Sequence, residues 1–129
     1  MSDFSNALKV TTTGLQAQAA RLRLLSENIA NVDTPGYRRK TMPFEAMPTA
    51  ADVTGVRAGD VTLDRTDLEV VHDPAHPLAD ETGTYLGSNV DLIIEIADAR
   101  EAQRSYEANL KMFDQTRQMS TSLMDLLRR

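Results

Sequence analysis

The residues of this chain whose types and spacing could do chemistry are His72, Asp73 and His76. Two imidazoles and a carboxylate are groups that zinc accepts as ligands. Zinc motifs with His at positions i and i+4 depend on a helix to place both rings on one face. Here Pro74 pushes Asp73 toward extended backbone, and Pro77 follows closely, so a helix is disfavoured. A loop whose polar groups are satisfied locally is therefore a better interpretation than a metal site.

Other chemical motifs are missing from the sequence. The acidic loop residues Asp64, Asp67, Asp80 and Glu81 lack the spacing of an EF-hand. The chain has no Gly-x-Ser-x-Gly elbow, no phosphate-binding Gly-Lys loop and no Cys, so disulfides and thiolate ligands are excluded. We therefore predict no enzymatic activity, no catalytic residue, no metal and no cofactor.

The charge of the chain indicates which classes of partner it is expected to bind. Arg38, Arg39 and Lys40 form a basic run for which a phosphate site is a weak alternative. The net charge is −5 and the isoelectric point is about 4.9. An acidic chain is not expected to use nucleic acid or an anionic membrane as its main partner.

The chain is predicted to be folded and not to insert into a membrane. It has 129 residues, a one-domain length, with 41% hydrophobic and 26% charged residues, so we do not expect wholesale disorder. No stretch approaches the roughly 20 apolar residues of a membrane span. The start, residues 1–4, has neither a basic nor an apolar signal region, so we expect no cleaved secretory signal.

Two apolar stripes, one at each end of the sequence, are the elements that must position everything else. Both follow the spacing of a coiled-coil seam. The first consists of Leu8, Leu15, Leu22 and Ile29, with Leu25 and Val32 at the intermediate heptad spacing. The second consists of Leu92, Ile96, Ala99, Tyr106, Leu110, Phe113, Thr116, Met119, Leu123 and Leu126, with a polar gap at Gln103.

The first stripe predicts a helix over residues 5–31. Its start is weak, because Thr11, Thr12, Thr13 and Gly14 together cost roughly 3 kcal/mol of helix propensity relative to Ala. Such a helix depends on packing for its stability. We therefore expect this segment to fray in the free monomer, which fast amide hydrogen exchange would reveal.

Turn residues divide the rest of the chain. Pro35 and Gly36 mark a turn after the first helix. Short strands are predicted at residues 53–57, 60–63, 68–71 and 84–86, enough for a small sheet or a pair of hairpins. Ser88, with Asp91 three residues on, predicts the N-cap of a helix that runs from Val90 to Arg129 without Gly or Pro.

These elements predict an α+β fold in which two long terminal helices pack as a coiled coil beside a small β-rich middle. The segments are residues 1–34, the N-terminal helical segment, residues 35–87, the β-rich middle, and residues 88–129, the long C-terminal helix, which forms one unit with the first. The last stripe would extend for about 60 Å and the first helix for only about 40 Å. An uncovered apolar strip normally marks an interaction surface. We favour assembly over the alternative, a two-helix hairpin with the middle folded over the excess.

The stretch from Asn28 to Tyr37 resembles the N-terminal signature of the flagellar axial proteins, the rod and hook family of the bacterial flagellum. That pattern runs Leu-x-x-Gln, then a helix, then Asn-x-Ala-Asn-x-x-Thr-x-Gly-Tyr. The matching residues are Leu15, Gln18, Asn28, Ala30, Asn31, Thr34, Gly36 and Tyr37. Residues 72–80, 89–90 and 102–109 look like the proximal-rod members of this family, whereas residues 45–70 match nothing diagnostic. Thr84 stands before Tyr85 where the family would lead us to expect Gly.

The resemblance implies a structural subunit of the proximal rod in the flagellar basal body. Such proteins leave the cell through the flagellar type III export apparatus without signal cleavage, and the rod lies in the periplasm. They assemble helically with copies of themselves and other rod proteins, line the export channel with their terminal helices and transmit torque. Phe4 and Leu8 resemble a hydrophobic export motif, although a first-turn staple of the helix is an equally good local interpretation.

We predict the assembly interface on the two stripes. It comprises Leu8, Leu15, Leu22, Leu25 and Ile29 on the first helix, and Tyr106, Leu110, Phe113, Met119, Leu123 and Leu126 on the last. The alternative function is a cytoplasmic coiled-coil adaptor or chaperone-like binding module that uses the same stripes in a small soluble oligomer. An axial subunit should purify as a monomer that is partly unfolded at both ends, whereas an adaptor should elute as a defined helical oligomer.

Overall fold

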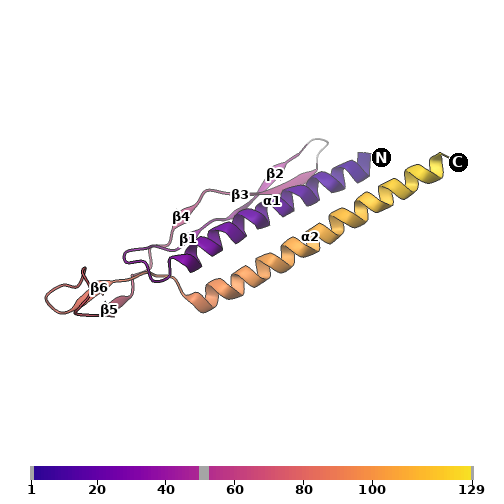
Figure 1. The fold of residues 1–129 in the computed structure, drawn as a ribbon. Coiled ribbons are helices and arrows are strands. Elements are labelled where there is room, and N and C mark those ends of the chain that lie inside the picture. The colour runs from indigo at the N-terminus through magenta and orange to yellow at the C-terminus, as the bar shows by residue number, and fades with distance from the viewer. Residues whose placement is uncertain (1, 50–52, 129) are drawn as a thin grey trace.

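Two long antiparallel helices dominate the protein. The computed structural model describes residues 2–49 and 53–128. Helix α1 (Ser2–Ala30) and helix α2 (Leu92–Leu127) lie side by side, with the two chain ends at the same end of the molecule (Figure 1). Shorter β segments connect them. The predicted α+β fold, with paired terminal helices and a small β-rich middle, is confirmed.

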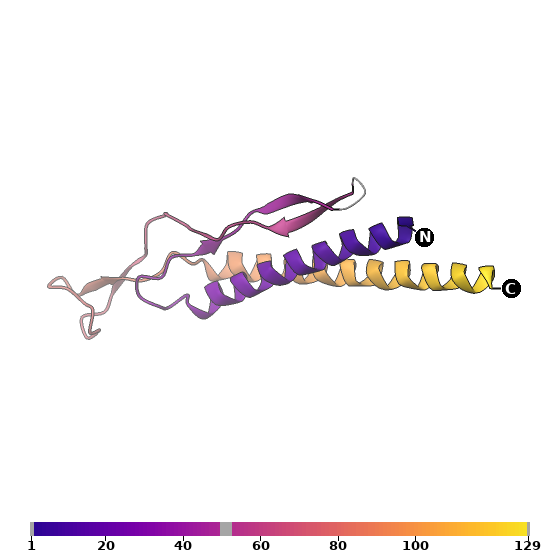
Figure 2. The same ribbon diagram turned by 90° about the horizontal axis from the view of Figure 1, so that it is seen from above.

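Over its described residues, the middle of the chain forms three separate two-stranded antiparallel ladders rather than one sheet. Strand β1 pairs with β4, β2 with β3, and β5 with β6. The β2–β3 ribbon lies along α1, and the β5–β6 ladder projects beyond the other end of the helices (Figures 1 and 2). The strands are β1 (Lys40–Thr41), β2 (Phe44–Pro48), β3 (Thr54–Ala58), β4 (Thr62–Leu63), β5 (Val70–His72) and β6 (Thr84–Leu86).

The predicted strands agree with four of these elements to within about two residues at their ends. The sequence pattern does not reveal β1 or β2. Strand β1 has only two residues, and β2 is exposed at four of its five positions, so neither has the alternation of a half-buried strand. Pro48 also ends β2, and Pro is unfavourable in an interior strand.

The predicted N-cap of the last helix is wrong. Helix α2 begins at Leu92, and Asp91 is its N-cap, because the Asp91 carboxylate accepts from the backbone N–H of Ile93 at 3.1 Å and of Ile94. Ser88 is buried, and its hydroxyl instead donates to the Val32 carbonyl just after α1. Because the Ser88 hydroxyl is engaged in that hydrogen bond, it does not cap the helix, and Asp91 serves as the N-cap instead.

The Thr-rich turn of α1 is helical because it packs between two partners. Helix α1 contacts α2 and also β3. The buried Thr13 hydroxyl donates to the Val10 carbonyl at 2.7 Å and accepts from the Val56 N–H of β3 at 3.1 Å. Gly55 faces it so closely that an added Cβ would lie 2.6 Å from Thr13 Oγ1. Tertiary contact thus overrides weak local propensity.

Replacing Gly55 by Ala should destabilise the fold. The added methyl group would collide with Thr13, and overpacking of this kind typically costs about 1–3 kcal/mol. Urea denaturation followed by circular dichroism would measure the change in the free energy of unfolding. The matched control is Thr54→Ala at the neighbouring exposed position. Equal stability of the two variants would contradict the close approach of β3 to α1.

Over the described residues, α1 and α2 both lack a continuous apolar stretch of the length that a bilayer span requires.

Candidate assembly surface

Asn28 joins the last turn of α1 to the segment that follows it. Its side chain is fully buried. Its Oδ1 accepts from the Tyr37 hydroxyl at 2.8 Å and from the Lys40 N–H at 2.9 Å, and its Nδ2 donates to the Lys40 carbonyl at 2.9 Å. Burial and the charge of Glu27 raise the pKa of the Tyr37 hydroxyl, so it remains a donor at neutral pH. Asn28 therefore closes the turn back onto the helix.

The other residues of the predicted motif build this turn. Ala30 is the last residue of α1. Asn31 Nδ2 donates to the Glu27 carbonyl at 2.8 Å, and the Thr34 hydroxyl donates to Asn31 Oδ1 at 3.0 Å. Gly36 has φ 73°, and its N–H reaches the carbonyls of Leu86 and Gly87. Few residues other than Gly adopt that φ, so the turn depends on Gly36 to meet the end of β6.

Arg39 and Glu95 form the charged centre that links the turn to the start of α2. Glu95 is completely buried and accepts a hydrogen bond from Arg39 Nε. Asp98 and Asp64 carboxylate oxygens lie 3.6 Å and 3.7 Å from the same guanidinium. The backbone N–H of Arg39 donates to Asn89 Oδ1 at 2.6 Å. Burial lowers the pKa of Arg39, but these carboxylates more than offset it, so the pKa is raised.

The three basic residues of the turn are all held by the chain itself, which argues against the phosphate alternative. Arg39 is paired as above. Lys40 forms an ion pair with Glu27, and Arg38 donates to the carbonyls of Asp64 and Thr66 at 3.3 Å and 3.1 Å. An incoming anion would have to displace these contacts.

The His72–His76 segment is a satisfied turn near the tip of the molecule. The His76 ring stacks on Tyr85 with 3.9 Å between centroids, and His76 Nδ1 accepts from the Leu78 N–H at 3.1 Å. Asp73 Oδ1 accepts from the Ala75 N–H at 3.2 Å. Within residues 2–49 and 53–128, no group of three or more His, Asp or Glu side chains is arranged to hold a metal ion.

The predicted interface residues divide into two sets. On α1, Leu25 is buried, while Leu8, Leu15, Leu22 and Ile29 are half-buried. On α2, Tyr106 and Phe113 are half-buried. Exposed residues on α2 are Leu110, Met119, Leu123 and Leu126. The single apolar seam expected on α2 is therefore only partly turned toward α1.

The line of α2 that packs inward includes small and polar residues that the apolar pattern missed. Glu95 and Ala102 are its buried members, and Asn109 lies against Gly14 of α1. Arg21 of α1 forms an ion pair with Glu101 at 3.6 Å. Residues 95, 102 and 109 are seven positions apart, and this spacing could have predicted the inward line. A search restricted to apolar residues does not find it, because Glu95 and Asn109 are polar.

Phe4 lies beside the exposed end of α2. It is half-buried and lines a groove of about 610 Å³ together with Met119, Leu123 and Leu126. Helix α2 has 36 residues and α1 has 29, so α2 is longer by roughly 10 Å. Among the residues that the structure describes, Phe4 is the only α1 side chain that lines this groove beside the apolar end of α2.

Comparison with known proteins places these features in one family. Residues 8–38 match the family described as "Flagella basal body rod protein", and residues 82–126 match "Flagellar basal body rod FlgEFG protein C-terminal". A flagellar basal-body rod protein FlgC of Agrobacterium fabrum is 43% identical, covering 99% of this chain and 98% of that protein. The chain belongs to the FlgC family of flagellar basal-body rod proteins. The resemblance of residues 28–37 to rod proteins is thereby confirmed.

More distant relatives carry the same name. The FlgC proteins of Escherichia coli and Borreliella burgdorferi are each 32% identical, covering 94% and 95% of this chain and 96% of each relative. The chain is accordingly a structural subunit of the flagellar basal-body rod and not an enzyme.

Replacing Arg39 by Met should destabilise the protein strongly. Glu95 would be left buried without its cation, and breaking a buried pair in this way costs about 3–5 kcal/mol. Adding Glu95→Gln should restore part of the loss, because a neutral amide is easier to bury. Thermal and urea unfolding of both variants would measure this coupling.

The matched control is Arg57→Met, which breaks the exposed ion pair of Arg57 with Glu45. That change should cost less than about 1 kcal/mol. If Arg39→Met were no more harmful than this control, the Arg39–Glu95 pair would not be the link between the turn and α2.

Proposed function

We propose that the chain assembles helically in the proximal rod, with copies of itself and with other axial rod proteins, by burying the exposed apolar side of α2. Of the predicted interface residues, Leu110, Met119, Leu123 and Leu126 are exposed on α2, and we propose that assembly also covers the half-buried ones on both helices. Several large apolar side chains of α2 support it, because they are exposed in the single chain. They are Leu110, Met112, Met119, Leu123, Met124, Leu126 and Leu127.

One observation carries the proposal, namely the excess surface of the single chain. Its accessible surface is 8842 Å². A compact protein of 14.3 kDa exposes roughly 6,800 Å². The difference, about 2,000 Å², is as large as a specific protein–protein interface. Part of this excess surface is apolar, because large apolar side chains of α2 are exposed, so partners that cover them are expected.

The roles of the assembled subunit follow from its place in a rod. Contacts between different surfaces of successive copies build an open helix when the rotation does not close a ring. Two long helices tied at one end by Asn28 and by Arg39 with Glu95 would resist shear between subunits. We propose that the rod transmits torque through them and that their packed layer lines the export channel.

Flexible Met side chains suit a surface that meets partners of different sequence. Met112, Met119 and Met124 are all exposed on α2, and thioethers adapt to irregular neighbours. This feature favours a rod of several related proteins over the adaptor alternative, in which one small closed oligomer would bury the stripes. Family membership favours the same choice.

Placing a charge on the exposed apolar side should block rod assembly. We expect Leu123→Asp to lower the amount of this chain in detergent-extracted basal bodies by about tenfold or more, because a buried unpaired carboxylate costs several kcal/mol. Quantitative mass spectrometry of the basal bodies would measure it, with other rod proteins as the reference.

The matched control is Thr121→Asp, which adds the same charge in the same turn. Positions 121 and 123 do not share a face of the helix. Thr121→Asp should leave rod incorporation close to the wild-type level. Equal incorporation of Leu123→Asp and wild type would contradict an interface on this side of α2.

We also propose that the chain is exported by the flagellar type III apparatus without signal cleavage, with Phe4 and Leu8 as part of the export signal. Phe4→Ala should lower the fraction of the chain found outside the cytoplasm, while Ser5→Ala should not. Immunoblots of cell fractions would measure this fraction. Normal secretion of Phe4→Ala would count against the export role and would leave the packing of Phe4 beside Met119 and Leu123 as its function.

A further inference from the structure

Two exposed surfaces, one acidic and one basic, carry charged side chains that form no ion pair among the described residues. The first is the β5–β6 hairpin, defined here as residues 67–86. It carries five acidic residues and neither Lys nor Arg, so its formal charge of −5 equals that of the whole chain. Among the described residues, none of these five carboxylates forms an ion pair. They are Asp67, Glu69, Asp73, Asp80 and Glu81.

Apolar side chains accompany this charge on the hairpin. Val70 is 64% exposed and lies directly opposite Leu86 in the ladder. Leu86 and Leu78 line one groove of about 390 Å³ together with Asp80 and Tyr85. Hydrogen bonds from Thr82 and Thr84 hold the pKa of Asp80 below its ordinary value and so favour its charged form. The hairpin is thus an acidic and apolar projection.

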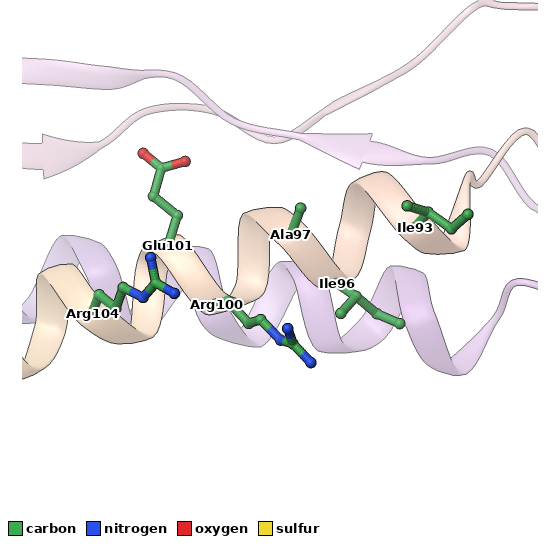
Figure 3. A pocket seen from close by; sticks show the side chains of 6 residues that line it. All are labelled: Ile93, Ile96, Ala97, Arg100, Glu101 and Arg104. Carbon is green, nitrogen blue, oxygen red and sulfur yellow. The ribbon is translucent and has the colours of Figure 1, made fainter.

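The second surface is a strip on the first three turns of α2. This outer strip consists of Ile93, Ile96, Ala97, Arg100 and Arg104, which line a shallow groove of about 440 Å³ together with Glu101. Ile93 is 81% exposed. Figure 3 shows Ile96 and Arg100 extending to one side of α2 while Glu101 extends to the other.

Internal ion pairs leave the outer strip basic. The carboxylates in these turns are used inside the chain, because Glu95 and Asp98 pair with Arg39, and Glu101 pairs with Arg21. Arg100 and Arg104 form no ion pair among the residues that the structure describes. Two free guanidinium groups beside exposed isoleucines fit an acidic and apolar partner.

We propose that the β5–β6 hairpin of one copy docks on the outer strip of α2 in the next copy. Val70, Leu78 and Leu86 would cover the isoleucines of the strip, and Glu69 and Glu81 would face Arg100 and Arg104. The hairpin projects beyond the helices, which leaves it free to reach a neighbour (Figures 1 and 2). The contact joins two different surfaces, so it propagates from copy to copy as a helical rod requires. This inference rests on the proposed function and names one contact within it.

Compensating charge reversal tests the contact. Arg100→Glu with Arg104→Glu, and separately Glu69→Arg with Glu81→Arg, should each lower the amount of the chain in basal bodies by about three- to tenfold. The four changes together should return it to within about twofold of wild type, because the charges are again complementary. The variants replace the native gene, and mass spectrometry of detergent-extracted basal bodies gives the amounts.

A matched control reverses two other exposed cations of α2, with Lys111→Glu and Arg117→Glu. Adding the hairpin reversal to this control should restore nothing. A second test uses the absence of native Cys. Oxidised rods of the Leu86→Cys/Ile93→Cys variant should contain disulfide-linked dimers, whereas rods of Leu86→Cys/Thr121→Cys should not.

The outcomes separate this contact from the proposed function. If the strip reversal lowered incorporation and the hairpin reversal failed to restore it, the strip would bind another protein and the proposal would be overturned. Normal incorporation of both double variants would overturn it as well. Absence of the wild-type chain from basal bodies would instead overturn the proposed function itself.

Discussion

Within the part of the chain that the structure describes, helix α2 is covered on one side only, and the rest of the structure depends on this constraint. Helix α1 packs against it, while the β2–β3 ribbon lies along α1 and contributes little to α2. Among the described residues, the buried apolar side chains are Ala17, Leu25 and Ala102. A core of this size stabilises a chain of 129 residues only weakly, so we expect neighbouring subunits to supply further stabilising contacts.

Polar contacts set the geometry that the small apolar core cannot. Thr13, Asn28, Ser88 and Glu95 are all buried, and each binds a partner from another part of the chain. Buried polar groups of this kind are costly when unpaired, which penalises any other register of the two helices. The single chain therefore presents the exposed side of α2 in one orientation, ready for a neighbour.

The sequence allowed much of this to be predicted. The spacing of Leu8, Leu15, Leu22 and Ile29 gave the first helix to within three residues of its observed start, and the Asn28–Tyr37 pattern gave its end and its family. Both patterns involve residues that are close in sequence, so they can be recognised without knowing how distant segments pack.

What could not be predicted depends on contacts between distant residues. Glu95 belongs to the buried line of α2 only because Arg39 reaches it from another segment. The cap moved from Ser88 to Asp91 because Val32 holds the Ser88 hydroxyl. Strand β2 exists because β3 pairs with it, although its own residues are mostly exposed. Such positions show no periodicity of their own.

Amide hydrogen exchange of α2, compared between the purified chain and the chain within isolated rods, tests the account most directly. We expect residues 110–127 to exchange rapidly in the purified chain, where Leu110, Leu123 and Leu126 are exposed, and slowly in the rod. Residues 95–109, held by Glu95 and Ala102, should be better protected in both. Equal exchange of residues 110–127 in the two states would contradict the claim that the rod covers this side of α2.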